Sequence, residues 1–162
     1  MRRDERLIEL SREHHTALTL ARRLRLAHGS SEALAAAGAS VRSLHAELEQ
    51  HFDEEEVRLL PILRACAPEL ASQLMHEHVA LRALLERSDE AAALERLGTL
   101  LEAHVRFEER VMFPRLEDYW RASGERAVMA PPACRASDAA TRAHFGEGVR
   151  AEHAHRNSIH AR

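Results

Sequence analysis

The sequence predicts an all-α protein, an up-down-up-down four-helix bundle followed by an irregular C-terminal tail. Alanine, leucine, arginine and glutamate dominate the composition and β-branched residues are scarce, which favours helix over sheet. Apolar residues also recur at steps of three and four along four successive segments, the spacing of one buried helix face. The connections between these segments are short, and short connections make neighbouring helices antiparallel.

The first two helices are predicted from their apolar stripes and from the residues that end them. The first stripe runs from 7 to 24, and Gly29 with the two serines after it ends the helix. The second stripe runs from 41 to 59. Pro61 is expected to kink or close this helix, because proline lacks an amide donor and clashes with the preceding turn.

The third and fourth helices complete the bundle. Pro68 suits the first turn of the third helix, whose stripe runs from 70 to 85. Ser88 and Asp89 are expected to cap the fourth helix, whose stripe runs from 94 to 112. Two helix hairpins are therefore predicted.

The chain length and its change of character predict one domain and a tail. A chain of 162 residues is long enough to bury one sizeable core. Residues 1–120 hold the periodic segments and form the predicted bundle domain. Residues 121–162 lack an apolar period, so we expect a tail that lies on the surface or is poorly ordered. The histidines of this tail have no fixed framework for binding metal.

Charge, hydropathy and cysteine content exclude several classes of function. A net charge of −3 argues against nucleic-acid binding, which needs a basic face. The sequence contains no apolar run long enough to span a membrane and no signal-peptide pattern, so a cytoplasmic protein is expected. The two cysteines lack C-x-x-C spacing and predict neither a thiolate zinc site nor a disulfide framework.

One short motif occurs twice, once in the second helix and once in the fourth. His51 is followed four residues later by Glu55, and His104 is followed in the same way by Glu108. In each copy a proline follows ten residues after the histidine. Four residues are slightly more than one helical turn, so the imidazole and the carboxylate of each pair share a face. Their neighbours Glu54 and Glu109 are expected to lie to the side and not to bind metal, with Glu54 either solvated or a supporting acid.

The first and third helices repeat at an offset of 64 and add one histidine each. Glu13 and His14 then align with Glu77 and His78. A single histidine on an apolar face is usually an ordinary core residue, but the repeat favours a ligand at each of these places. On the first helix His15 competes with His14. His14 continues the apolar stripe, so it is the preferred ligand, with His15 as the alternative or as a supporting residue.

Four histidines and two glutamates in the centre of a bundle predict a site for two metal ions. Burying so many polar groups without partners would be costly, and bound cations supply the partners. Two imidazoles serve each metal and both carboxylates bridge, so every ion has four protein ligands and open positions. Imidazole and carboxylate donors without thiolate suit iron, with manganese or zinc as alternatives.

These residues and their spacing resemble the hemerythrin-like proteins, also called the HHE cation-binding family. The resemblance covers roughly residues 5–118. It implies a four-helix bundle that holds two iron ions, joined by an oxo or hydroxo bridge, between its helices. It also implies chemistry with dioxygen, peroxide or nitric oxide.

The chain departs from the oxygen-carrying members of that family at two places. Those proteins have two histidines one turn apart on the third helix, whereas Leu74 and Arg82 flank His78 at that spacing here. They also end with histidine and aspartate five residues apart, whereas His104 and Glu108 are four apart. The more symmetric ligand set predicts redox or sensing chemistry rather than stable oxygen carriage.

The sequence thus predicts a di-iron protein that binds, senses or reduces a small diatomic molecule or peroxide. Two alternatives remain open: an iron-storage or iron-sensing module without catalysis, and a structural bundle closed by zinc. The sequence leaves enzymatic activity and any protein partner undetermined. The candidate metal ligands are His14, His15, His51, Glu55, His78, His104 and Glu108.

Overall fold

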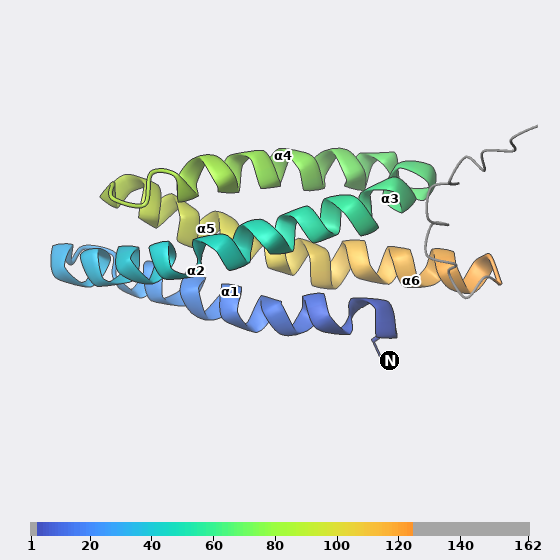
Figure 1. The fold of residues 1–162 in the computed structure, drawn as a ribbon, viewed down its shortest axis with the longest axis horizontal. Helices are drawn as coiled ribbons and strands as arrows, with labels where there is room; N and C mark the ends of the chain where they lie inside the picture. The colour runs from blue at the N-terminus through green and yellow to red at the C-terminus, as the bar shows by residue number, and fades with distance from the viewer. Residues whose placement is uncertain (1–2, 125–162) are drawn as a thin grey trace, which may run out of the picture. The chain divides into compact units, whose positions relative to one another are not determined.

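The computed structural model describes residues 3–124, and within them the secondary structure consists of helices and the short turns that join them (Figure 1). The all-α prediction is confirmed. The elements are the 3-10 turn η1 (Glu5–Leu7), α1 (Ile8–Leu26), α2 (Ser31–Arg58), α3 (Leu60–Cys66), α4 (Pro68–Leu85), α5 (Ala91–Phe107), the π-helix η2 (Glu108–Met112) and α6 (Phe113–Ala122).

These helices make a bundle with four sides (Figure 1). Helix α1 contacts α2 and α5, and α4 also contacts α2 and α5. Helix α3 follows α2 on one side, and η2 with α6 follows α5 on another. The predicted four-helix bundle is therefore confirmed, with two of its sides built from more than one helical element.

The turns between helices explain where each hairpin reverses. Gly29 has a φ of 81°, a left-handed conformation that glycine adopts without strain, and it ends the turn after α1. The Ser30 hydroxyl then accepts from the amide of Ala33 and caps α2, which begins well before the predicted stripe.

The prediction that Ser88 and Asp89 cap the fourth helix is wrong. The residue at the cap position of α5 is Glu90, and its side chain makes no capping hydrogen bond. Arg87 holds that carboxylate instead, at 2.8 and 2.5 Å. Ser88 is buried. A Cβ on Gly38 of α2 would lie only 2.9 Å from the Ser88 carbonyl oxygen. Close packing of this turn against α2 therefore replaces capping.

The two prolines of the repeated motif interrupt their helices in different ways. The expected break at Pro61 is confirmed, because α2 ends at Arg58 and Pro61 lies in the first turn of α3. At Pro114 the chain passes through a π-helix, in which the Phe113 amide donates to the Glu108 carbonyl oxygen five residues back. The sequence pattern did not predict this π-helical segment.

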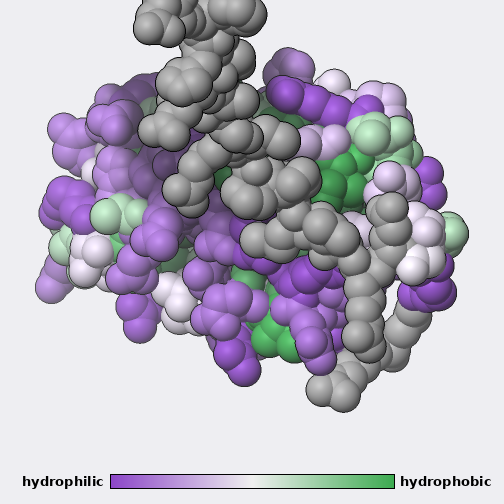
Figure 2. All heavy atoms as spheres, turned by 45° about the vertical axis from the view of Figure 1, so that its right-hand side comes forward, coloured by the Kyte–Doolittle hydropathy of each residue, from purple (hydrophilic) through white to green (hydrophobic). Residues whose placement is uncertain are grey.

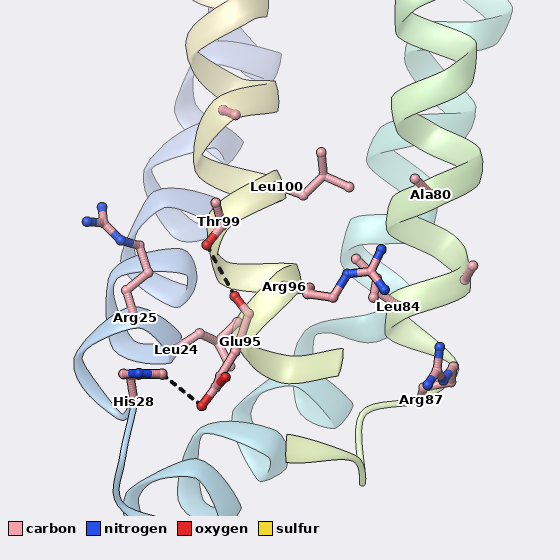
Figure 3. Close-up of a pocket in the computed structure, with 12 residues that line it drawn as sticks. Leu24, Arg25, His28, Ala80, Leu84, Arg87, Glu95, Arg96, Thr99 and Leu100 are labelled. Carbon is pink, nitrogen blue, oxygen red and sulfur yellow. Dashed lines mark hydrogen bonds and ion pairs between the residues drawn. The ribbon is translucent and has the colours of Figure 1, made fainter. Parts of the chain in front are cut away.

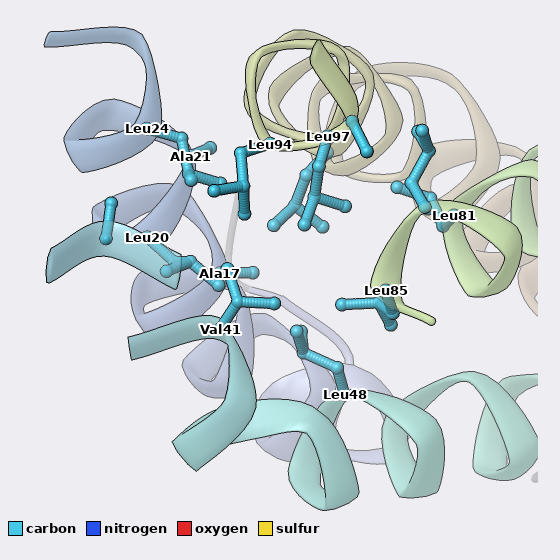
Figure 4. Close-up of a cluster of buried hydrophobic side chains, with 14 of the residues drawn as sticks. Ala17, Leu20, Ala21, Leu24, Val41, Leu48, Leu81, Leu85, Leu94 and Leu97 are labelled. Atoms are coloured by element: carbon cyan, nitrogen blue, oxygen red, sulfur yellow. The ribbon is translucent and has the colours of Figure 1, made fainter. Parts of the chain in front are cut away.

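Two separate apolar clusters form the core. We call them the turn-side cluster, part of which is shown in Figure 4, and the proline-side cluster. The turn-side cluster consists of Ala17, Leu20, Ala21, Leu24, Ala27, Leu34, Ala37, Val41, Leu48, Phe52, Leu81, Leu84, Leu85, Ala93, Leu94, Leu97, Leu101 and Val105. The proline-side cluster consists of Leu7, Leu10, Leu59, Leu60, Leu63, Ala67, Ala71, Leu74, Phe107, Met112, Phe113, Leu116 and Trp120.

The surface of the bundle is mainly hydrophilic where Figure 2 shows it, with small apolar areas between polar side chains. None of the helices in residues 3–124 has both the length and the apolar character needed to cross a membrane. The predicted domain boundary at 120 falls near the end of α6, and nearly all of the predicted tail, residues 125–162 with its histidines, lies outside the described residues.

Candidate metal centre

Six polar side chains lie buried between the two apolar clusters, and each side of the bundle contributes at least one. Each of them is 5% exposed or less. They come from α1 (His14), α2 (His51 and Glu55), α4 (His78), α5 (His104) and η2 (Glu108). The apolar stripes explain this placement, since each stripe passes from one cluster to the other in the region of its ligand positions. His14, for example, lies between Leu10 and Ala17.

The six side chains form two groups that share both carboxylates. One group contains His14 and His51, the other contains His78 and His104, and Glu55 and Glu108 belong to both. Within each group one ligand atom per residue lies within 4.8 Å of all the others. The structure does not bring His15 into either group, because that side chain is exposed on α1.

The atoms that face the centre of the cluster have no hydrogen-bond partner among the described residues. They are the Nε2 atoms of all four histidines and both carboxylate oxygens of Glu55 and Glu108. Several lie close together, with Nε2 to oxygen distances of 3.0 Å for His104–Glu108, 3.1 Å for His14–Glu108 and 3.3 Å for His78–Glu55. None of these contacts has hydrogen-bond geometry, although buried polar atoms are normally satisfied. Eight converging, unsatisfied atoms therefore require a partner.

The outward-facing nitrogen of every histidine is held by a further glutamate. The four pairs are His14–Glu109, His51–Glu13, His78–Glu56 and His104–Glu77, with Nδ1 to oxygen distances of 2.7–2.8 Å. A carboxylate accepts, so in a neutral imidazole Nδ1 carries the proton and Nε2 presents a lone pair toward the centre. This carboxylate–histidine arrangement is the usual support of a metal-bound imidazole.

These supporting glutamates connect the four sides of the bundle in a closed circuit. Glu13 on α1 reaches His51 on α2, and Glu56 on α2 reaches a histidine on α4. Glu77 on α4 reaches a histidine on α5, and Glu109, which follows α5, returns to α1. We call these four residues the outer carboxylates.

Sequence reasoning did not assign the outer carboxylates a role, although the repeat contained a signal for them. Glu13 and Glu77 directly precede ligand positions and align at the offset of 64. Glu56 and Glu109 directly follow Glu55 and Glu108 and align at the offset of 53. Glu109 was expected to lie to the side, as it does, but its side chain still reaches His14.

Without a cation, the buried groups perturb one another strongly. Burial raises the pKa of Glu55 well above its ordinary value, and the neighbouring Glu108 carboxylate adds to the rise. Burial alone would lower the pKa of His104, but the Glu108 carboxylate outweighs it and raises that pKa to about 9. Burial and the charge of His104 lower the pKa of His78 to about 4. A proton on His104 thus partly replaces the positive charge that a cation would supply.

The donor set fits a pair of cations. Lone pairs of imidazole and carboxylate that point at one another repel unless a positive charge lies between them. Two ions would each receive two histidines and a share of two carboxylates, which leaves coordination positions free for a small ligand. Within residues 3–124 no thiolate takes part, because Cys66, the one cysteine there, lies outside both groups.

A small cavity borders one side of the cluster. It has a volume of about 130 Å³ and lies between α1 and α2, where Glu13, Leu48 and His51 are among its lining residues. A wider surface cavity of about 820 Å³ lies over α5 between α1 and α4, with Arg25, Arg96 and Leu100 at its wall (Figure 3). None of the residues that line this wider cavity belongs to the cluster.

The fold and the buried cluster define a helical-bundle protein with a histidine–glutamate site of the kind that holds cations. A family model described as the hemerythrin HHE cation binding domain matches residues 7–93, which is more than half of the chain. The chain belongs to this family. No curated protein and no solved structure matches it. The matched residues include His14, His51, Glu55 and His78, and the fold brings α5 and η2 to them with the remaining pair.

Proposed function

We propose that the chain is a non-haem di-iron protein that binds, senses or reduces dioxygen, peroxide or nitric oxide. In this proposal four histidines would hold the ions in two pairs, and two glutamates would serve both ions. The residues are His14 with His51, His78 with His104, and the bridging Glu55 and Glu108. The observation that carries the proposal is the set of eight buried ligand atoms that converge without any hydrogen-bond partner.

The choice of iron follows from the donor types and the open positions. Mixed imidazole and carboxylate donors suit iron, and manganese or zinc are the alternatives. When bound, two iron ions supply electrons and coordination positions for a small oxidant. The protein holds the imidazoles in one tautomer through the outer carboxylates and excludes bulk water with the two apolar clusters.

The size of the cavity beside His51 supports a small ligand over an organic substrate. Its volume of about 130 Å³ is below the roughly 300 Å³ at which pockets for drug-sized molecules begin. Dioxygen, nitric oxide and peroxide fit such a space. The lining combines apolar residues such as Leu44 and Leu48 with polar residues such as Thr16 and Gln50.

Metal analysis and an absorption spectrum of aerobically purified protein, expressed with ample iron, test the proposal. We expect about two iron ions per chain, one for each ligand group, and charge-transfer bands of a bridged iron pair in the near ultraviolet. Tightly held zinc without iron under these conditions would contradict it and favour a structural bundle. Consumption of peroxide or dioxygen by the loaded protein then separates reactive chemistry from iron storage or iron sensing.

A further inference from the structure

Arg82 contacts the outer carboxylate Glu56, which in turn contacts the candidate ligand His78. Arg82 of α4 donates from Nη1 to Glu56 at 2.6 Å, and the same Glu56 oxygen accepts from Nδ1 of His78 at 2.8 Å. Arg82 also donates to Glu49 at 2.8 Å and to Asp53 at 2.9 Å. One guanidinium is thus fixed against three carboxylates of α2, and only one of these touches a candidate ligand.

A second arginine reaches the equivalent carboxylate of the other hairpin. Glu109 accepts from His14 at 2.8 Å and from the Ser11 hydroxyl at 2.7 Å, and it forms an ion pair with Arg3. Glu56 and Glu109 are equivalent in the repeat. Both are therefore outer carboxylates whose negative charge is partly neutralised by arginine.

No arginine within residues 3–124 pairs with either of the other two outer carboxylates. Among the described residues Glu13 pairs with His51 alone, and Glu77 pairs with His104 and accepts from the amide group of Gln73. Each proposed ion would therefore have two differently supported histidines. The outer carboxylate of one histidine pairs with an arginine, and the outer carboxylate of the other does not.

The two arginines did not arise as copies of each other in the repeat. At the offset of 64, the residue that aligns with Arg82 is Leu18, and the residue that aligns with Arg3 is Ala67. The carboxylates are equivalent, but the arginines come from different places. The same type of contact is therefore made twice by arginines from positions that are not equivalent in the repeat, so it does not follow from the repeat itself.

The effect follows from how a carboxylate supports a ligand. A carboxylate that accepts from Nδ1–H raises the electron density that the imidazole offers at Nε2. A guanidinium hydrogen-bonded to the same oxygen withdraws part of that negative charge. It also adds a positive charge near the centre, which disfavours the more positively charged state of a bound ion.

We propose that Arg82 is a positioning residue that tunes, through Glu56 and His78, the ion held by His78 and His104. This inference rests on the proposed function, since it assigns a role toward the ions of that site. It makes the arginine, which contacts no candidate ligand itself, a determinant of the redox potential of the pair. Arg3 has the corresponding role for His14.

The test compares three variants of the full chain by the midpoint potential of the iron-loaded protein and by the visible spectrum of the Co²⁺-loaded protein. Arg82→Gln removes the positive charge, so the potential should fall and the cobalt band should shift. Glu56→Gln removes the negative charge, so the potential should rise and Co²⁺ affinity should drop roughly 10–100-fold. Asp53→Asn is the matched control. It removes an exposed contact of Arg82 but leaves the contact with Glu56, so both readouts should stay at wild-type values.

Opposite shifts from Arg82→Gln and Glu56→Gln would support the inference, because a purely structural role of this ion pair gives the same sign for both. Arg82→Lys should lie between wild type and Arg82→Gln. Should Arg82→Gln fail to fold, Arg82→Lys still decides, because a potential and a cobalt spectrum equal to wild type in that variant would overturn the inference. A changed melting temperature with unchanged potential and spectrum would overturn the inference and leave the proposed function standing. A wild-type chain that binds neither iron nor Co²⁺ would overturn both.

Discussion

The two helix hairpins, α1–α2 and α4–α5, contribute the same donor types to the cluster but differ in backbone and in exposure. After the shared His–Glu motif, the first hairpin breaks its helix before Pro61 and the second passes through a π-helix before Pro114. His78 and His104 are fully buried, whereas His51 is 5% exposed and borders a cavity. The donors keep their places while the backbone after them varies, so the cluster is the more tightly constrained part of the repeat.

Metal removal is the strongest test of whether the two hairpins depend on a common centre. Bound ions stabilise only the folded state, and without them buried polar atoms oppose packing. We expect chelation to lower the melting temperature by more than about 10 °C, because each kcal/mol shifts a domain of this size by roughly 2–8 °C. Thermal unfolding followed by circular dichroism, before and after chelation, measures this. Identical melting curves would mean that the cluster carries no stabilising ion.

Replacing the shared carboxylates tests whether the hairpins are equivalent. Glu55→Ala and Glu108→Ala each remove a donor that belongs to both ligand groups. Metal content should therefore fall cooperatively to far less than one ion per chain in either variant, as measured by elemental analysis. Retention of one clean ion in one variant would show that the hairpins are not equivalent. Retention of two ions in both would contradict a shared site.

Replacing an outer carboxylate should affect metal binding less than replacing Glu55 or Glu108, and by a different amount in each hairpin. The Glu77 side chain is 19% exposed and that of Glu13 is 43% exposed, so water can replace the support of His51 more easily than that of His104. Glu77→Gln should weaken metal binding by up to roughly 10–100-fold and Glu13→Gln by less. Competition titration with a coloured chelator measures both affinities. An equal loss in the two variants would show that exposure does not distinguish the hairpins.

The smallest effect is expected at the residue next to His14. His15 is exposed and belongs to neither ligand group, so His15→Ala should keep full metal content. His14→Ala should lose metal, because its Nε2 faces the cluster. Metal analysis of the two variants side by side decides between them. If His15→Ala strips the metal and His14→Ala keeps it, the assignment on α1 is off by one residue.

The sequence predicted most of the fold and the residues of the cluster because both depend on periodicity. The apolar stripes identify the helices, and the repeat identifies which polar residues interrupt those stripes. The structure brings together the six residues that the repeat singled out and leaves His15 apart, while their role as metal ligands stays a prediction. The helix break at Pro61 could also be predicted from the sequence, since proline acts through local sterics.

Features that depend on contacts between helices could not be predicted in this way. Glu56 lies beside the apolar stripe, and its contact with His78 depends on how α2 packs against α4. The turn before α5 packs closely against Gly38 of α2 through the Ser88 carbonyl oxygen, a contact that no capping pattern encodes. The periodicity of the sequence does not predict the π-helix before Pro114, because the apolar spacing continues through it.

The circuit of outer carboxylates has a consequence for how the chain assembles. Two of its contacts, Glu13–His51 and Glu77–His104, form within a hairpin, and the other two form only when the hairpins meet. Likewise each ligand group takes three side chains from one hairpin and one carboxylate from the other. A hairpin alone can therefore prepare a three-donor half-site, and docking of the second hairpin supplies the last donor to both sites at once. Cations bound there would act as cross-links between the two hairpins, which no disulfide within residues 3–124 joins.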